Sequence, residues 1–444
     1  MPFRLPALTR SWALRFFFLL TFFGIGLGLV LKFADKRTKG TDWPIPLYYG
    51  KKRAKHVAPE SLVGAYSLGA DFAEVYVASL AARELRSKGE TQFREFRPVA
   101  YPPLTLWLYG WLEGVPYPRV LTIHSLVSLG AFLLAVALVF FRTRLLRHFW
   151  KVGLLTLAVC FCTPAGYSHY ERGQFDLYTS AAIFLCLAPV WIERGRVPCA
   201  VAGGFFAALK LSSLPFLGTF SLPAAVSDAP RRRLVYLVAP AILVLSLLVF
   251  ASDLPRLAEA MQHMEGAATG GQVPIGEREA IRGVSFLLLL PPLLAKSVQI
   301  LSALAFIVAL RSPGLPDRPG RFAAAAFPFA LAMVIQGMAY GAGSWEYRIV
   351  ALLGTAAAFV LWVEKVPGLA RIQTVVGLGF GVFLLLASRT FHFVFYAKPS
   401  WQAAGMAACY LAFSLAFLGV AVAIGLGKWR SEEAEKGSRE PQTA

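Results

Sequence analysis

From Thr122 to Phe141 the chain reads TIHSLVSLGAFLLAVALVFF, and basic residues follow at Arg142, Arg144 and Arg147. The quoted stretch carries no acidic, lysine or arginine side chain and has the length of about 20 residues that an α-helix needs to cross a bilayer. Backbone groups in lipid have no water to bond, so such a segment satisfies them internally as a helix. The stretch predicts a membrane-spanning helix that ends at a basic loop.

The rest of the chain repeats this pattern. Of the 444 residues, 57% are hydrophobic and only 16% are charged, so the apolar runs exceed what a soluble core buries. The sequence therefore predicts an all-α polytopic membrane protein with about 12 transmembrane helices. We place these near residues 13–31, 119–141, 151–166, 174–192, 197–211, 212–227, 233–252, 283–310, 321–340, 347–364, 371–388 and 401–427.

Lys and Arg outnumber Asp and Glu by 44 to 25, which gives a net charge of +19. The basic residues gather in the short loops between predicted helices, where the positive-inside rule places them in the cytoplasm. Such clusters attract anionic lipid, and they argue against nucleic acid as a partner. Both termini are then cytoplasmic, and residues of about 32–118 form a long loop on the outer side.

Residues 1–430 are predicted to form one transmembrane domain, and residues 431–444 a polar, disordered cytoplasmic tail. The first apolar segment has no clear cleavage site, so we interpret it as a retained anchor. Two glycine runs, at residues 24–28 and 377–381, lie inside predicted spans and favour close helix packing over nucleotide binding. The five cysteines and six histidines show no metal-binding spacing, and we expect neither a metal ion nor a cofactor.

Polar residues other than Lys and Arg collect on the predicted outer side. In the first outer loop, apolar residues at near-helical spacing predict an amphipathic helix over about 68–86, with Asp71 and Glu74 on its polar side. A second helical element over about 101–114 starts at Tyr101-Pro102-Pro103, whose prolines require an extended entry. Both helices are predicted to lie at the membrane interface.

Four segments carry a resemblance to a known family. In chain order they are Asp71 with Tyr76, Tyr101-Pro102-Pro103, Gly173-Gln174 before an apolar helix, and Gly203, Ala207 and Lys210. This order resembles the GT-C class of polyprenyl-phosphate-sugar-dependent glycosyltransferases, in particular glycosyltransferase family 87 with its polyprenyl-phosphomannose-dependent alpha-mannosyltransferases. The resemblance covers residues of about 65–215. Asp176 departs from it, standing where an amide or a small residue is expected, and no long soluble C-terminal domain follows.

The resemblance implies an inverting transfer of a hexose, mannose by analogy, from a polyprenyl phosphate to a lipid or glycan acceptor. It implies a multi-pass protein of a bacterial inner membrane with its site on the non-cytoplasmic face. Asp71 matches the acid that accepts the proton of the acceptor hydroxyl. Donor phosphate and sugar are expected to meet a second group of residues, namely Lys210, Arg172, Arg282, Arg348, Gln174, Tyr101 and Glu74.

Each of these residues also has a structural interpretation. Asp71 would serve as a helix N-cap, and Lys210 would extend its ammonium to the interface without binding anything. The corresponding structural roles are a solvated charge or ion pair for Glu74, an ion pair with Glu346 for Arg348, a chain-shaping role for Tyr101, and helix capping for Gln174 and Asp176.

Two further function classes stay open beside the glycosyltransferase. A transporter or lipid flippase would place ionisable residues at mid-membrane and use short or broken helices in two corresponding halves. Apart from Lys210 and Lys296 the predicted spans hold few such charges, and the sequence shows no repeat. A non-catalytic assembly subunit would tolerate the loss of Asp71.

Overall fold

A computed structural model describes residues 10–39, 70–87, 101–163, 166, 169, 173–258, 292–340, 346–387 and 399–428. Within these ranges every regular element is helical. The α-helices are α1 (Arg10–Lys39), α4 (Ala70–Ser87), α5 (Pro103–Gly110), α6 (Tyr117–Thr143), α7 (Phe149–Cys162), α9 (Asp176–Leu187), α10 (Arg196–Ala207), α11 (Leu214–Ser227), α12 (Arg233–Val249), α15 (Pro292–Leu310), α16 (Arg318–Tyr340), α17 (Leu352–Lys365), α18 (Ala370–Ala387) and α19 (Pro399–Gly425). Short 3-10 turns include η2 (Ala188–Val190), η3 (Leu211–Ser213), η4 (Ala251–Asp253) and η6 (Glu346–Ala351).

The predicted fold class is confirmed at the level of an all-helical chain with several apolar helices. A helix lies in each of the predicted spans, from α1 to α19, with ends that differ from the prediction by a few residues at most positions. Among the described residues, three helical stretches are long and apolar enough to cross a membrane, at Ser11–Val30, Tyr117–Thr143 and Arg318–Gly337. A fourth arises if Arg233–Val249 and Ala251–Ala258, which meet at 77°, form one broken span. The predicted count of about twelve spans is not reached on this measure.

Short helices explain the difference. The predicted spans at 197–211 and 212–227 correspond to α10 and α11, which have 12 and 14 residues. At 1.5 Å per residue each is about 18–21 Å long, well below the hydrocarbon core of about 30 Å. They follow one another along the chain, and each packs against α12. The segment between them, residues 208–213, holds Lys210 and Ser213 buried in protein. In this segment the Leu209 carbonyl oxygen and the Lys210 ammonium have protein partners, as a buried connection between short helices requires.

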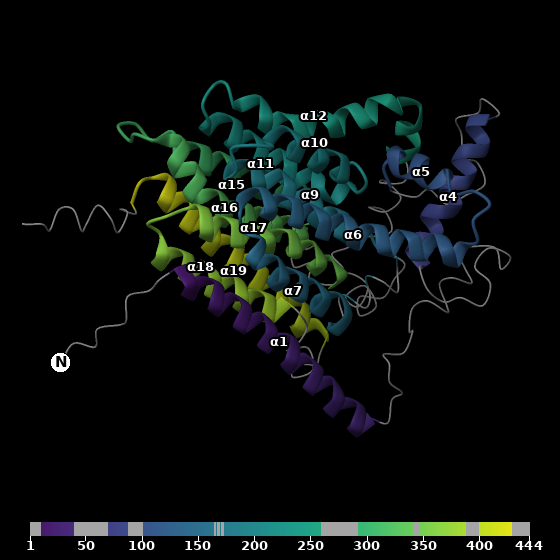
Figure 1. Ribbon diagram of the computed structural model, residues 1–444, viewed down its shortest axis with the longest axis horizontal. Helices are drawn as coiled ribbons and strands as arrows, with labels where there is room; N and C mark the ends of the chain where they lie inside the picture. The colour runs from purple at the N-terminus through teal and green to yellow at the C-terminus, as the bar shows by residue number, and fades with distance from the viewer. Residues whose placement is uncertain are drawn as a thin grey trace, which may run out of the picture.

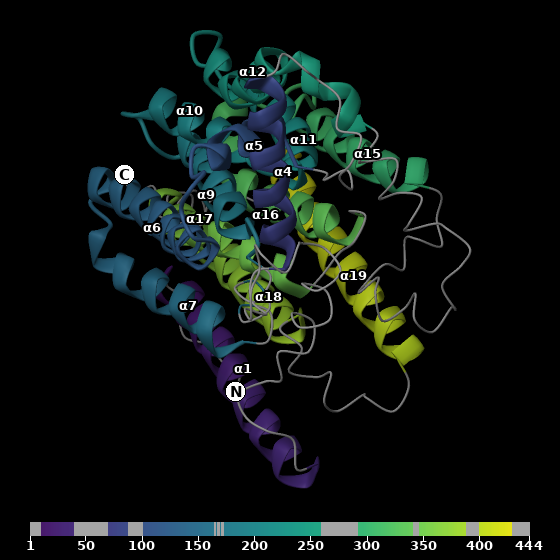
Figure 2. The ribbon, with the colours of Figure 1, turned by 90° about the vertical axis from the view of Figure 1, so that its right-hand side faces the viewer.

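The two helices predicted in the first outer loop are present as α4 and α5 (Figure 1). Pro102 has the extended backbone that the proline pair requires, and Pro103 opens α5. The apolar face of α4 is covered by α5 and by residues near the start of α9, so it packs on protein. Tyr76 anchors α4 by donating its hydroxyl to the carbonyl oxygens of Leu112 (2.9 Å) and Val115 (3.2 Å). From the right-hand side of Figure 1, which is the view of Figure 2, α4 and α5 lie in front of the other helices.

Close helix packing at the glycine runs is confirmed for several positions. α1 lies along α18 at the edge of the bundle (Figure 1). A Cβ added at Gly377 would come within 2.8 Å of the Ala13 carbonyl oxygen, and one at Gly24 within 3.0 Å of Leu385. The missing side chains therefore allow these two helices to approach each other.

Basic helix ends meet at one end of the bundle. Lys365 at the end of α17 donates to the Thr143 carbonyl at the end of α6 (3.1 Å), and Arg147 pairs with Glu364 (3.1 Å). Gly195, between α9 and α10, lies beside Arg142 near the end of α6, since an added Cβ would be 3.3 Å from Arg142 Nη1. The last residues of α9 therefore point to the basic end, and its first residue, Asp176, lies at the other end. The helices thus separate a basic end from an end that holds α4, α5 and the start of α9.

Candidate functional site

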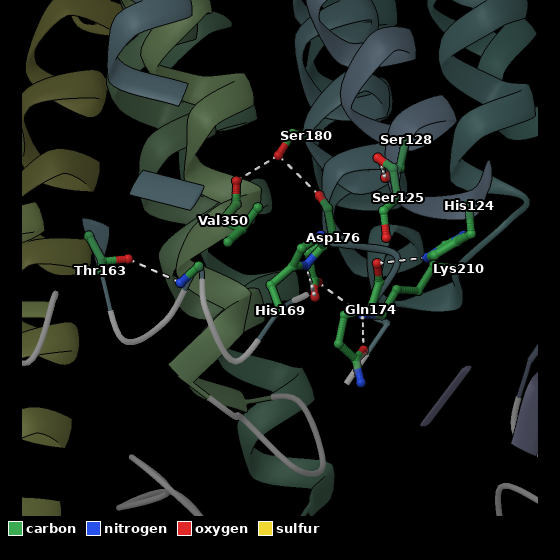
Figure 3. Close-up of polar contacts among 11 residues, drawn as sticks. His124, Ser125, Ser128, Thr163, His169, Gln174, Asp176, Ser180, Lys210 and Val350 are labelled. Carbon is green, nitrogen blue, oxygen red and sulfur yellow. Dashed lines mark hydrogen bonds and ion pairs between the residues drawn. The ribbon is translucent and has the colours of Figure 1, made fainter. Parts of the chain in front are cut away.

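A buried ion pair lies at the start of α9. The Lys210 ammonium is 2.9 Å from Asp176 Oδ1 and donates a second hydrogen bond to Gln174 Oε1 at 3.2 Å (Figure 3). Asp176 is 1% exposed, Gln174 2% and Lys210 9%. Removing two charges from water is expensive, and ionisable residues inside membrane proteins commonly mark functional sites. This pair is therefore the first candidate for a functional role among the described residues.

The position of Lys210 follows from how α10 packs. Gly203 faces α9, where an added Cβ would lie 2.7 Å from Cys186 Sγ, and Gly204 faces α12, where it would lie 2.7 Å from the Ala239 carbonyl oxygen. Two glycines side by side let α10 fit between these helices. Beyond the helix end, Thr105 of α5 donates to the Leu209 carbonyl at 2.8 Å. α10 and the segment after it, which carries Lys210, are thus held by α5, α9 and α12.

Two histidines extend the polar cluster. The His124 ring on α6 lies between the Tyr109 hydroxyl, 2.5 Å from Nδ1, and the Gln174 carbonyl oxygen, 3.2 Å from Nε2. On the other side of the ion pair, His169 Nδ1 is 3.8 Å from Asp176 Oδ2. Burial lowers the pKa of His169, and the Asp176 carboxylate opposes that shift only in part. His169 is therefore neutral at pH 7.

Aromatic packing joins the start of α4 to this cluster. The Phe72 ring stacks on His124, with centroids 4.6 Å apart, and Phe175 lies 5.0 Å from the Tyr101 ring. Gly173 has φ +65°, and a Cβ there would lie 2.5 Å from Phe72 Cβ. Glycine is required at this position both by its backbone conformation and by this close approach.

The structure thus brings Lys210, Gln174 and Tyr101 of the predicted site together. Asp71 and Glu74 lie on the first turns of α4, next to Phe72, and Arg348 lies in η6, two residues before Val350, whose carbonyl accepts a hydrogen bond from Ser180 of α9 at 2.7 Å. The side chains of Asp71, Glu74 and Arg348 fall outside the described part of the chain. So do Arg172, Arg282 and the predicted tail 431–444.

The sequence alone did not reveal the partners of this group. It suggests a cap or a sugar contact at Asp176, whereas this residue is the counter-ion of Lys210. His124 and His169 carry no sequence signal, because each is a single histidine outside any metal-binding or catalytic spacing. The one available signal is the unexpected acid at Asp176, since a buried lysine on a neighbouring helix end requires a compensating charge.

No family model matches the chain, and no curated protein and no solved structure matches it either. The chemical interpretation of the site therefore depends on its residues and their geometry.

Proposed function

We propose that the protein is a membrane glycosyltransferase of the GT-C type, which moves a hexose from a polyprenyl phosphate to a lipid or glycan acceptor. The observation that carries the proposal is the convergence of four segments that are distant in sequence. Residues from the start of α4, from Tyr101, from Gly173-Gln174 and from Lys210 pack around one buried ion pair. These are the segments whose order resembles the glycosyltransferases. Mannose is favoured as the sugar by that resemblance alone.

In the proposed reaction, Asp71 accepts the proton of the acceptor hydroxyl. The acceptor oxygen forms a bond to the anomeric carbon of the sugar from the face opposite the phosphate. The bond between that carbon and the phosphate oxygen breaks, and its electron pair leaves with polyprenyl phosphate. The configuration at the anomeric carbon is thereby inverted. A general base of this kind contributes typically 10²–10⁴-fold to the rate.

The buried pair has a positioning role in this proposal. Lys210 already faces a carboxylate at 2.9 Å, so its charge is compensated before a donor arrives. The donor phosphate is then bound mainly by Arg172, Arg282 and Arg348, which remain predicted contacts. Lys210 instead holds Gln174, and through the adjacent residues Gly173 and Phe175 it supports the packing of α4.

The proposed sidedness follows from the basic helix ends. If that end faces the cytoplasm, the end with α4 and α5 faces the opposite side, where a lipid-linked donor is within reach. Tags at Lys151 and Arg232 should then report the cytoplasm, and tags at Lys88 and Gly270 the other side. Labelling of Lys88 from the cytoplasmic side only would reverse the orientation and reject the proposed outer site.

Asp71→Asn provides the decisive experiment. Membranes carrying each variant are supplied with a radiolabelled polyprenyl-phosphate sugar and native acceptors. Asn keeps the size of the side chain but takes no proton, so turnover should fall by roughly 10²-fold or more with normal protein accumulation. Glu84→Gln, which changes an exposed carboxylate further along the same helix, is the matched control and should retain most activity.

A purely structural role for Asp71 gives a different result. α4 begins at Ala70, so Asp71 lies in the first turn, where an acid contributes typically 0.3–1 kcal/mol through the helix dipole. Asn caps a helix about as well as Asp. Unchanged turnover in Asp71→Asn would therefore reject the catalytic role and make Glu74 the next acid to test.

A transporter or flippase is the second candidate, and one observation favours it. The Lys210–Asp176 pair lies at the break between two short helices, α10 and α11, and transporters form buried binding sites at broken helices. Proteoliposomes with labelled donor on one side separate the two functions. A flippase moves the intact donor without an acceptor, whereas a glycosyltransferase forms a labelled product only when acceptor is present.

A further inference from the structure

A small cavity of about 30 Å³ lies where α9, η3, α11, α16 and η6 meet. Its polar lining comes from two elements: Asp176 and Thr179 of α9, and Ser212 and Ser213 of η3. Its apolar lining includes Phe216 of α11 and Met333 of α16. Asp176 thus takes part in two environments, because its Oδ1 bonds Lys210 and the residue also borders this cavity.

The polar atoms of this lining are not satisfied by the protein. Thr179 Oγ1, Ser212 Oγ and Ser213 Oγ are buried and make no hydrogen bond to any residue that the structure describes. Asp176 Oδ2 makes none within hydrogen-bond distance either, and His169 Nδ1 lies 3.8 Å from it. Asp176 and Ser213 are each 1% exposed and Thr179 is 4% exposed. Most buried polar groups in proteins are hydrogen-bonded, since each unmet group costs about 1–3 kcal/mol.

The next residue on the same helix behaves differently. Ser180 is 0% exposed, and its hydroxyl donates to the Asp176 carbonyl at 3.0 Å or to the Val350 carbonyl at 2.7 Å. Hydroxyls of α9 therefore find protein partners when they face another helix. Three unmet hydroxyls beside the Asp176 carboxylate indicate that a ligand supplies their partners.

The chemistry of the lining excludes three ligand classes. An apolar ligand would leave the four polar atoms unmet. An anion would be repelled by the Asp176 carboxylate. A metal cation would compete with the Lys210 ammonium, which already lies 2.9 Å from that carboxylate and would repel a second charge at such short range. A neutral hydroxyl group remains, because it both donates to the carboxylate and exchanges hydrogen bonds with Thr and Ser hydroxyls.

We propose that this cavity is a binding site for neutral hydroxyl groups, occupied by water or by a hydroxyl arm of a sugar. About 10–15 Å³ on this measure holds one water molecule, so the cavity fits two waters or one hydroxymethyl group and excludes a whole sugar ring. The site lies next to the buried ion pair, so its occupant also solvates the Asp176 carboxylate. Binding of a hydroxyl group here does not require the proposed glycosyl transfer.

The proposal is tested by whether removing a lining hydroxyl lowers or raises the melting temperature. Thr179→Val keeps the shape of the side chain and removes its hydroxyl. If a hydroxyl ligand bonds Thr179, the melting temperature of the purified protein in nanodiscs should fall by a few degrees. If the hydroxyl has no partner, removing it should leave the melting temperature unchanged or raise it. Thr355→Val is the matched control, since that hydroxyl is equally buried and bonds the Leu352 carbonyl of its own region at 2.7 Å.

Ser213→Ala repeats the test with a smaller change, and methyl α-mannoside distinguishes the two hydroxyl sources. A rise in the wild-type melting temperature with the mannoside, absent in Thr179→Val, assigns the site to a sugar hydroxyl. No such difference, together with melting temperatures of Thr179→Val and Ser213→Ala below that of the wild type, as for Thr355→Val, assigns it to water. Melting temperatures of both variants at or above that of the wild type, with Thr355→Val below it, would overturn the proposal.

Discussion

Removing one partner of the Lys210–Asp176 pair should destabilise the protein more than removing both. The pair joins α10 to α9 across 2.9 Å, and its side chains are 11% and 1% exposed. Deleting one partner of a buried pair leaves the other charge uncompensated, at a cost of typically 3–5 kcal/mol. Lys210→Met and Asp176→Asn should each lower the free energy of unfolding by about that amount. Methionine fills the space of the lysine stem, so lost packing adds little.

The double variant separates charge from packing. Lys210→Met with Asp176→Asn leaves no buried charge at either position, so its loss should be about 1–3 kcal/mol, well below the sum of the single losses. The resulting coupling energy should exceed about 2 kcal/mol, within the range seen for residues in direct contact. Unfolding by denaturant in mixed micelles, with the slope compared among variants, measures each value.

Lys365→Met is the control for replacing a lysine. Lys365 is exposed and donates one hydrogen bond to the Thr143 carbonyl at 3.1 Å, so its loss should cost no more than about 1 kcal/mol. Single losses below about 1 kcal/mol at Lys210 and Asp176, adding up in the double variant, would match a solvated surface pair. That result would refute the conclusion that this pair is buried and structurally required.

Two further predictions concern the neighbours of the pair. Gly173→Ala should destabilise the protein and displace the start of α4, because the glycine has φ +65° and faces Phe72 Cβ at 2.5 Å; protease sensitivity of α4 measures this. His169, which faces Asp176 and Lys210, has a pKa lowered by burial, so the unfolded chain binds the extra proton. Stability should therefore fall as pH drops below about 6.5, by up to about 1.4 kcal/mol per pH unit, and His169→Gln should flatten that slope in denaturant titrations at different pH values.

Much of the fold was predictable because hydrophobic periodicity and basic loops are local signals. α6 illustrates this, since its apolar run and Arg142 define it without reference to any neighbour. The extended entry to α5 was predictable for the same reason, because Pro102 and Pro103 restrict their own backbone. The end of α10 near Lys210 was not predictable in this way. It depends on tertiary contacts, because Thr105 of α5 bonds the Leu209 carbonyl oxygen and Asp176 of α9 bonds Lys210.

The candidate site was predictable in its members but not in its pairings. Motif order pointed to Lys210, Gln174 and Tyr101, and these residues do lie together. One sequence without its fold does not show which charged side chains contact each other. The Asp176 counter-ion and the unmet hydroxyls of Thr179 and Ser213 appear only when α9 and η3 are placed side by side.

The pairing also gives a physical reason for the order of the four segments. Lys210 bonds Gln174, the residue beside it is the glycine that admits Phe72, and Phe72 directly follows Asp71 in α4. Each contact depends on the type of residue present. Lys210 supplies a long cationic side chain and Gln174 an amide, the glycine has no Cβ, and Phe72 has a flat ring. A buried ion pair adds little net stability compared with apolar packing, so its value here is specificity. We infer that it fixes the position of the segment after α10 relative to the start of α9, and that this position determines where the first turn of α4 lies.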